Sequence, residues 1–176
     1  MKVRRWDEER IRRGSDGLAL LLADTVAGGA SVGFLAPLTP AAADGWWRER
    51  ADAVAAGRLE VWVAEDGTGR PAGTVGLALP DKPNSRHRAE LVKLMVHRRA
   101  RGAGLGRLLL ATAERAAAAA GLTLLHLDTE TGSPAERLYR SAGWTCAGTI
   151  PDYAANPAGE LCPTTLYYKR LAPAAG

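Results

Sequence analysis

The segment from Arg88 to Gly121 constrains this chain most, because it reads as a strand, a glycine-rich turn and a helix in direct succession. Residues 89–96 are mostly apolar, as in a strand that is buried on both faces. Apolar residues then recur at 3.6-residue spacing from Leu105 onward, and Gly121 is a suitable end for that helix. Between the strand and the helix lies the run Arg101-Gly102-Ala103-Gly104-Leu105-Gly106.

A glycine turn that opens a helix is suited to binding an anion. The first turn of a helix has N–H groups without intrahelical acceptors, at the positive end of the helix dipole. Glycines let the main chain approach a phosphate without a Cβ atom in the way. The dipole alone contributes only ~0.3–2 kcal/mol. Several N–H donors would therefore have to act together with Arg101 and Arg107.

Two common phosphate-binding motifs do not fit this turn. The P-loop requires Gly-Lys-Ser/Thr after four intervening residues, and neither Gly102 nor Gly104 is followed by it. The dinucleotide fingerprint Gly-x-Gly-x-x-Gly needs a third glycine. Its last position is Arg107 when counted from Gly102, and Leu109 when counted from Gly104.

The run 101–106 does match the acyl-CoA motif Gln/Arg-x-x-Gly-x-Gly/Ala, and on it the chain resembles the GNAT superfamily of N-acetyltransferases. The resemblance extends over residues 59–170 and is looser in the first third of the chain. The run Leu127–Ser133 further resembles the tabtoxin-resistance type. The family's fold is α/β: a mixed, mostly antiparallel sheet of six to seven strands, splayed between the fourth and fifth strands and flanked by about four helices. The resemblance implies this fold, with acetyl-CoA as co-substrate.

The resemblance also implies a set of cofactor-binding residues. In the family, the pantetheine arm of CoA lies in the gap of the splayed sheet and pairs with the main chain of the fourth strand. Gly132 stands where the family often has an asparagine, so the CoA contact of that asparagine is either missing or taken over by Ser133. The implied residues are Leu94, Met95, Val96, Arg101, Gly102, Ala103, Gly104, Leu105, Gly106, Arg107 and Ser133.

Acetyl transfer to an amine needs a base and a weak acid. An amine with a pKa near ~10.4 is almost wholly protonated at neutral pH, and the departing thiolate needs a proton. Residues 135–144 resemble the family segment Ala-x-x-x-Tyr…Gly-Phe, which implies Tyr139 as the acid. Two candidates for the base stay open, Glu90 and Asp128, with an ordered water as the alternative to both. His126 is expected to pack or hydrogen-bond within the sheet.

The rest of the chain predicts a simple order of elements. Residues 1–15 fit either a short strand or a charged helix. Further expected elements are helices over 16–27 and 40–56, a hairpin of strands 59–65 and 72–79, a strand over 122–129, a helix over 134–141, and two last strands over 144–150 and 164–171 joined by a long loop. The tryptophan pair 46–47 is more typical of core than of a substrate wall.

Composition and length limit the class of protein. A chain of 176 residues fits one domain, residues 1–176. The net charge is +4, but the basic residues are scattered apart from 86–88 and 97–101, and no nucleic-acid-binding signature accompanies them. The second cluster is interpreted as facing solvent or phosphate. No apolar run reaches the ~18 residues of a membrane helix, and no signal-peptide core follows the N-terminus. We therefore expect a cytoplasmic protein with free cysteines, no metal site, and no nucleic-acid or membrane partner.

Together these features predict an acetyl-CoA-dependent N-acetyltransferase that acts on the primary amine of a small molecule, an amino-acid-like compound or an antimetabolite. A protein N-acetyltransferase acting on lysine or an N-terminus, a non-catalytic CoA-binding module and a nucleic-acid-binding protein are the alternatives. The loops 31–38 and 151–163 should form a closed pocket for a small acceptor and an open groove for a protein. The resemblance also allows a homodimer.

Overall fold

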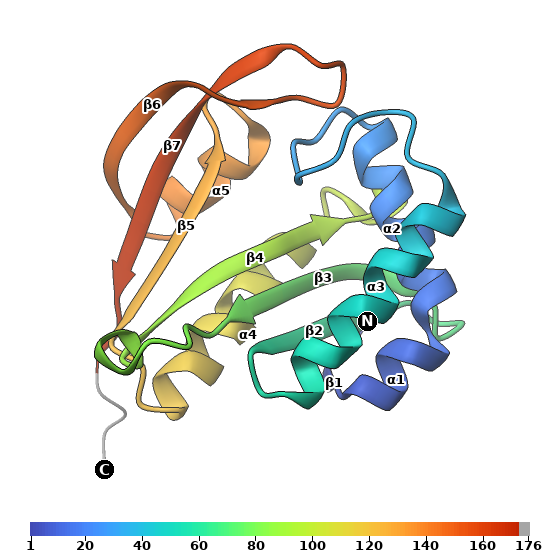
Figure 1. The fold of residues 1–176 in the computed structure, drawn as a ribbon, viewed down its shortest axis with the longest axis horizontal. Coiled ribbons are helices and arrows are strands. Elements are labelled where there is room, and N and C mark those ends of the chain that lie inside the picture. The colour runs from blue at the N-terminus through green and yellow to red at the C-terminus, as the bar shows by residue number, and fades with distance from the viewer. Residues whose placement is uncertain (173–176) are drawn as a thin grey trace.

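The computed structural model describes residues 1–172, which form one seven-stranded sheet flanked by five α-helices (Figure 1). The strands follow the order β1-β2-β3-β4-β5-β7-β6 across the sheet. They are β1 (Lys2–Trp6), β2 (Leu59–Glu65), β3 (Pro71–Ala78), β4 (Arg88–Val96), β5 (Leu124–Glu130), β6 (Thr145–Ala155) and β7 (Leu161–Arg170). The helices are α1 (Glu8–Arg13), α2 (Ser15–Ala27), α3 (Pro40–Ala55), α4 (Leu105–Ala119) and α5 (Pro134–Ser141).

Local sequence signals account for most element boundaries. The hydroxyl of Thr39 accepts a hydrogen bond from the N–H of Ala42 and caps α3, whose first residue is Pro40. Ser133 caps α5 in the same way. For residues 1–15 the sequence allowed a short strand or a charged helix, and the structure contains both: β1 is followed by Asp7, which caps the short α1. This extra helix brings the number in residues 1–172 to five instead of about four.

The sheet is antiparallel at every pairing except that of β4 with β5. That parallel pair extends over three residues only, from Arg88 with Leu124 to Glu90 with His126. Beyond it the two strands diverge, as Figure 1 shows. The predicted mixed sheet that is splayed between its fourth and fifth strands is therefore confirmed.

Each face of the sheet has its own hydrophobic core. Helices α1, α2 and α3 cover one face of β1–β4, where Leu18, Leu22 and Trp47 are almost fully buried. Helix α4 covers the opposite face with Leu109 and Leu110, and its core continues beneath α5 (Figure 1). The sheet is thereby held rigidly on both sides up to the point where β4 and β5 separate.

Two predictions about strands were wrong in detail. The last two strands are longer than expected, and residues 156–160 alone join them. Strand β6 continues past Pro151 because it bulges twice, with Asp152 at a φ of 51°. Strand β4 is not buried on both faces: Leu91 and Met95 are buried, but the residues between them are partly exposed to the gap beside β5.

No helix in the described part of the chain has the length and apolar character needed to cross a membrane.

Candidate functional site

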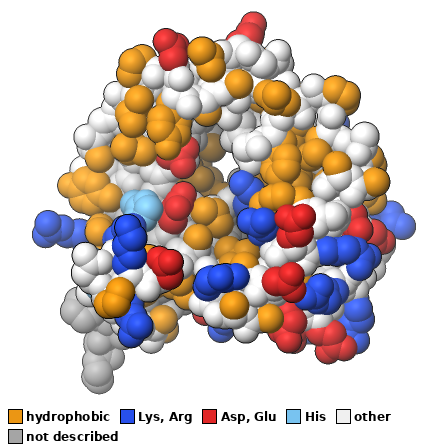
Figure 2. All heavy atoms as spheres, in the orientation of Figure 1, with side chains coloured by type: hydrophobic (Ala, Val, Ile, Leu, Met, Phe, Trp, Pro, Cys, Tyr) orange, Lys and Arg blue, Asp and Glu red, His pale blue; other side chains and the backbone are white. Residues whose placement is uncertain are grey.

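The divergence of β4 and β5 opens a cleft of about 930 Å³ in the middle of the molecule. It appears as the central hollow in Figure 2. The cleft is lined by β4, the glycine turn, the end of β5, the start of α5 and the loop between α2 and α3. Of the site residues predicted from the sequence, Ala103 alone does not line the cleft. The others all line it: Glu90, Leu94, Met95, Val96, Arg101, Gly102, Gly104, Leu105, Gly106, Arg107, Asp128, Ser133 and Tyr139.

Strand β4 presents an unpaired edge to this cleft. After Glu90, none of its residues pairs with another described strand on the β5 side. Its pairing with β3 shifts register between Thr74 and Gly76, and Lys93 there has a φ of 51°. The hydroxyl of Thr74 donates a hydrogen bond of 2.8 Å to the carbonyl oxygen of Lys93 and fixes this bulge. An extended ligand can therefore add to β4 through main-chain hydrogen bonds.

The glycine turn at the end of the cleft has an open helix N-terminus. Gly104, at a φ of 76°, precedes α4 without a side-chain cap. The first intrahelical bond runs from the N–H of Leu108 to the oxygen of Gly104, so the N–H groups of residues 105–107 have no acceptor within the helix. A Cβ atom built on Gly104 would meet no protein atom within 4 Å. The turn therefore has room and N–H donors for an anion.

The basic residues around this turn do not all face the cleft. Arg98 pairs with Asp24 at 2.8 Å, and Arg99 pairs with Asp66 at 3.2 Å. These two arginines pair with carboxylates of the protein, while their side chains remain about half exposed, so this part of cluster 97–101 faces solvent, one of the two environments predicted for it. Arg101 lines the cleft, and its Nε donates to the oxygen of Val96 at 3.1 Å.

Arg107 and Ser133 are engaged with neighbouring groups at the cleft wall. The guanidinium of Arg107 donates to the hydroxyl of Ser141 at 2.7 Å, which links α4 to α5. The hydroxyl of Ser133 accepts from the N–H of Glu136 at 3.1 Å and lies 3.3 Å from that of Thr129. Both residues are thus fixed in place where they border the cleft.

Tyr139 projects from α5 toward the cleft. Its side chain is 5% exposed, and its ring packs against Trp144 with the centroids 5.8 Å apart. Burial, and to a smaller degree the charge of Asp128, raises the pKa of its phenol above the ordinary value. The hydroxyl is therefore protonated at neutral pH and can serve as a donor.

The two predicted carboxylates lie on the strands that border the cleft. Glu90 is the last residue of β4 that pairs with β5, opposite His126, and Asp128 lies two residues further along β5. Both line the same cleft as Tyr139, and Asp128 is close enough to act electrostatically on its phenol. His126 is bonded to Arg88 at 2.6 Å, as expected for a histidine that hydrogen-bonds within the sheet.

A buried glutamate holds the helix that carries Tyr139. Glu136 accepts from the N–H of Gly132 at 2.5 Å and from the hydroxyl of Tyr167 at 2.8 Å. These two bonds, the one from Gly132 most of all, lower its pKa below the ordinary value of 4.5. Its stabilising contribution is therefore fully present above that pH and is lost as the pH falls through the lowered pKa.

We expect Glu136→Gln to lower the free energy of unfolding by about 1.5–3 kcal/mol near neutral pH, because two bonds to a charged acceptor are weakened. Urea denaturation of both proteins measures the difference, which should shrink as the pH falls below about 4.5. Glu9→Gln is the control, since Glu9 forms an exposed pair with Arg13 at 3.3 Å and should cost under ~1 kcal/mol. A difference in the free energy of unfolding between Glu136→Gln and the wild-type protein that stays constant down to low pH would contradict this role of the carboxylate.

Sequence reasoning missed Lys93, a charged residue of β4 that lines the cleft. Its ammonium donates to the oxygen of Val32 at 2.9 Å and lies 5.3 Å from the ring centroid of Trp46. Burial lowers its pKa below the ordinary value, and Arg50 lowers it further, whereas Asp128 and Glu90 oppose this shift. A lysine in the otherwise apolar run 91–96 was the available signal.

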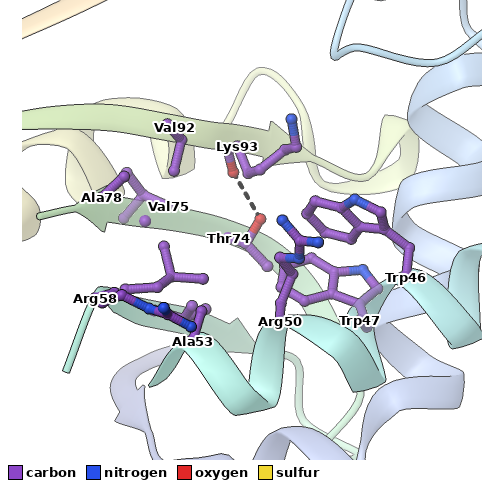
Figure 3. A pocket seen from close by; sticks show the side chains of 13 residues that line it. Trp46, Trp47, Arg50, Ala53, Arg58, Thr74, Val75, Ala78, Val92 and Lys93 are labelled. Carbon is purple, nitrogen blue, oxygen red and sulfur yellow. Dashed lines mark hydrogen bonds between the residues drawn. The ribbon is translucent and has the colours of Figure 1, made fainter. Parts of the chain in front are cut away.

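Trp46 and Trp47 lie in different environments. Trp47 is 1% exposed and belongs to the core, as predicted. Trp46 instead forms a wall with Phe34, whose ring meets it edge-on at 5.5 Å. Both tryptophans, Arg50 and Lys93 border a second pocket of 260 Å³ between α3 and strands β2–β4, which Figure 3 shows. This pocket and the cleft share Val92 and Lys93 as lining residues.

The two loops that were expected to decide between a closed pocket and an open groove meet across the molecule. The N–H of Ala36, in the loop between α2 and α3, donates to the oxygen of Pro157, in the loop between β6 and β7, at 2.8 Å. Figure 1 shows the two loops approaching each other above the splayed strands. Ala36 and Pro157 do not themselves line the cleft, but residues 28–33 of the first loop and Ala154 and Ala155 at the end of β6 do, so this contact joins two segments of the cleft wall.

Comparisons with known proteins agree on one fold. The sequence model of the Acetyltransferase (GNAT) family matches residues 16–144, well over half of the chain. The ribosomal-protein-alanine N-acetyltransferase of Brucella melitensis is 24% identical, with a TM-score of 0.76, and the match covers 97% of this chain and 100% of that one. YncA of Salmonella typhimurium, a provisionally assigned acetyltransferase solved with acetyl-CoA, is 21% identical, with a TM-score of 0.77 and coverages of 100% and 96%. A protein provisionally named phosphinothricin N-acetyltransferase is 20% identical, with a TM-score of 0.77 and coverages of 97% and 98%.

Proposed function

Because this chain belongs to the Acetyltransferase (GNAT) family, whose members take their acetyl group from acetyl-CoA, we propose that it acetylates a primary amine of a small molecule. The acceptor is an amino-acid-like compound or an antimetabolite. The observation that carries this choice is the hydrogen bond of 2.8 Å between Ala36 and Pro157, which ties together the two loops whose neighbouring residues 28–33 and 154–155 line the cleft. A protein segment would need an open groove there.

The residues of the cleft fit acetyl-CoA. The open N–H groups of residues 105–107 and the free space at Gly104 suit the pyrophosphate, with Arg101 beside them. The unpaired edge of β4, from Leu94 to Val96, suits the amide groups of the pantetheine arm. Ser133 and Arg107 border the same cleft. When bound, acetyl-CoA supplies a thioester whose carbonyl carbon is open to attack by an amine.

The chain's own side chains provide the proton transfers. Tyr139 holds a proton at its hydroxyl and donates it to the departing thiolate. Asp128 or Glu90 removes a proton from the ammonium of the acceptor, directly or through a water, since the protonated amine cannot attack. Both carboxylates border the cleft together with Tyr139.

Substitution of the two carboxylates should identify the base. We expect Asp128→Asn or Glu90→Gln, whichever removes the base, to lower kcat by about 100-fold, while the other variant stays within about threefold. The base variant should regain rate as the pH rises, because more of the acceptor amine is then neutral in solution. Steady-state rates of thiol release between neutral and alkaline pH measure both effects. If both variants keep the wild-type rate, neither carboxylate is the base, and an ordered water must accept the proton of the acceptor ammonium instead.

Two of the similar structures carry names that state an acceptor. One acetylates the alanine of a ribosomal protein, and the other is named for phosphinothricin. The resemblance of residues 127–133 to the tabtoxin-resistance type supports an acceptor of the second kind. The bridged cleft supports it independently.

The proposed function is tested by competition between acceptors. The protein is incubated with acetyl-CoA, a pool of small primary amines and amino acids, and a pool of peptides with free N-termini and lysines, and the products are read by mass spectrometry. We expect acetyl groups on small molecules and none above background on peptides. Acetylation of peptides alone would show that the acceptor is a protein.

A further inference from the structure

Two cations lie against the same tryptophan ring in the 260 Å³ pocket, which shares Lys93 with the cleft. The guanidinium carbon of Arg50 is 5.0 Å from the ring centroid of Trp46, and the ammonium of Lys93 is 5.3 Å from it. They come from distant parts of the chain, Arg50 from α3 and Lys93 from the bulge of β4. Figure 3 shows Arg50 and Trp46 extending from α3 toward β4, where Lys93 lies.

Carboxylates of the protein neutralise these cations poorly. In the described part of the chain, the ammonium of Lys93 has no carboxylate partner and donates to the oxygen of Val32. Arg50 pairs with its sequence neighbour Glu49 at 3.4 Å, whose side chain is 72% exposed. Its Nε is buried and has no hydrogen-bond partner among residues 1–172. A buried donor without a partner costs free energy, and an anion bound between the two cations would offset that cost.

The opposite charge lies on the strands of the same cleft. Glu90 and Asp128 line it, and both act electrostatically on Lys93. The site is therefore bipolar, with carboxylates where the acceptor amine must lose its proton and cations toward α3. A small molecule that carries both an ammonium and an oxyanion complements both ends.

We propose that Arg50 and Lys93 bind the acidic group of the acceptor, so that this enzyme selects zwitterions in which a carboxylate or phosphinate accompanies the primary amine. This inference rests on the proposed function and assigns the residues that recognise its substrate. Arg50 offers a planar fork that suits a two-oxygen anion, and Lys93 offers a point charge. The 260 Å³ pocket, lined mostly by apolar side chains, receives the remaining apolar part of the acceptor.

Matched acceptor pairs test this assignment. L-Phenylalanine and L-methionine are compared with the amines that lack their carboxylates, and with aminophosphinic acids of the same side chains. We expect the wild-type protein to have a kcat/KM at least about 30-fold higher for the acids than for the plain amines, because the plain amines cannot form the charge-assisted hydrogen bond. Arg50→Gln should lower this preference by about tenfold, mostly through KM, and leave the rates with the plain amines within about threefold. Lys93→Met should act in the same direction, and calorimetric titration of the CoA-saturated protein with the acids gives the same comparison without turnover.

The control is Arg48→Gln on the same helix. Arg48 is paired with Asp44 at 2.7 Å and lines neither the cleft nor the pocket, so its removal takes away the same charge without the proposed contact. Plain amines acetylated as well as their acids, or an Arg50→Gln variant that slows both classes equally, would overturn the inference and leave the proposed function standing. A protein that acetylates none of the small acceptors would overturn both.

Discussion

Gly104→Trp is expected to abolish measurable binding of acetyl-CoA. The residue precedes α4 at a φ of 76°, and a Cβ atom there points into space without protein atoms within 4 Å. An indole attached there would therefore project into the space beside the open N–H groups of residues 105–107. We expect the affinity to fall by more than about 100-fold, equivalent to roughly 2.7 kcal/mol. Isothermal titration calorimetry measures it directly.

A matched variant separates this blockage from backbone strain. Gly121 follows the other end of α4 at a φ of 80°, also has no protein atom near a built Cβ, and lies outside the cleft. A side chain at either position costs about 1–2 kcal/mol of strain in the left-handed region. Gly121→Trp should thus lose similar stability and keep its affinity within about threefold. Equal affinities in the two variants would show that the turn does not hold the cofactor.

Tyr139→Phe is expected to lower kcat by about 100-fold, the lower end of the usual effect of a general acid. The change removes the hydroxyl and keeps the ring, which packs against Trp144. Because the ring is 5% exposed and the fold around it is unchanged, binding of acetyl-CoA should stay within about twofold. Rates of thiol release and calorimetric affinities together distinguish the two effects.

Tyr153→Phe is the control for this variant. Tyr153 lies on β6, is 52% exposed and does not line the cleft. Loss of the Tyr153 hydroxyl should leave kcat and the affinity for acetyl-CoA at wild-type values. If Tyr139→Phe also retains kcat within about threefold, the departing thiolate takes its proton from another group, and Tyr139 serves packing alone.

The part of the cleft that we propose holds the acetyl donor could be predicted from the sequence because its signals are local. The glycines of residues 102–106 require a particular turn at the start of a helix, and Ser133-Pro134 starts the helix that presents Tyr139. Both features depend on residues within a few positions of each other. The resemblance to a known family then supplied the splayed sheet, which the divergence after Glu90 confirms.

The acceptor half could not be predicted in the same way. Lys93 reaches its position through a bulge with positive φ in β4, and its neighbours Phe34 and Trp46 come from the loop before α3 and from α3 itself. The bridge between Ala36 and Pro157 joins residues more than a hundred positions apart. No periodicity in the sequence encodes such contacts, because they depend on how separate elements pack.

Thermal denaturation with and without acetyl-CoA tests most directly whether the cleft of this protein holds the acetyl donor. A ligand that binds the folded state alone raises the midpoint of unfolding with its concentration, by about 2.7 kcal/mol of added stability at 100 times its Kd. We predict a rise that grows with acetyl-CoA and is absent in Gly104→Trp. An unchanged midpoint of the wild-type protein at millimolar acetyl-CoA would contradict the assignment of the cleft.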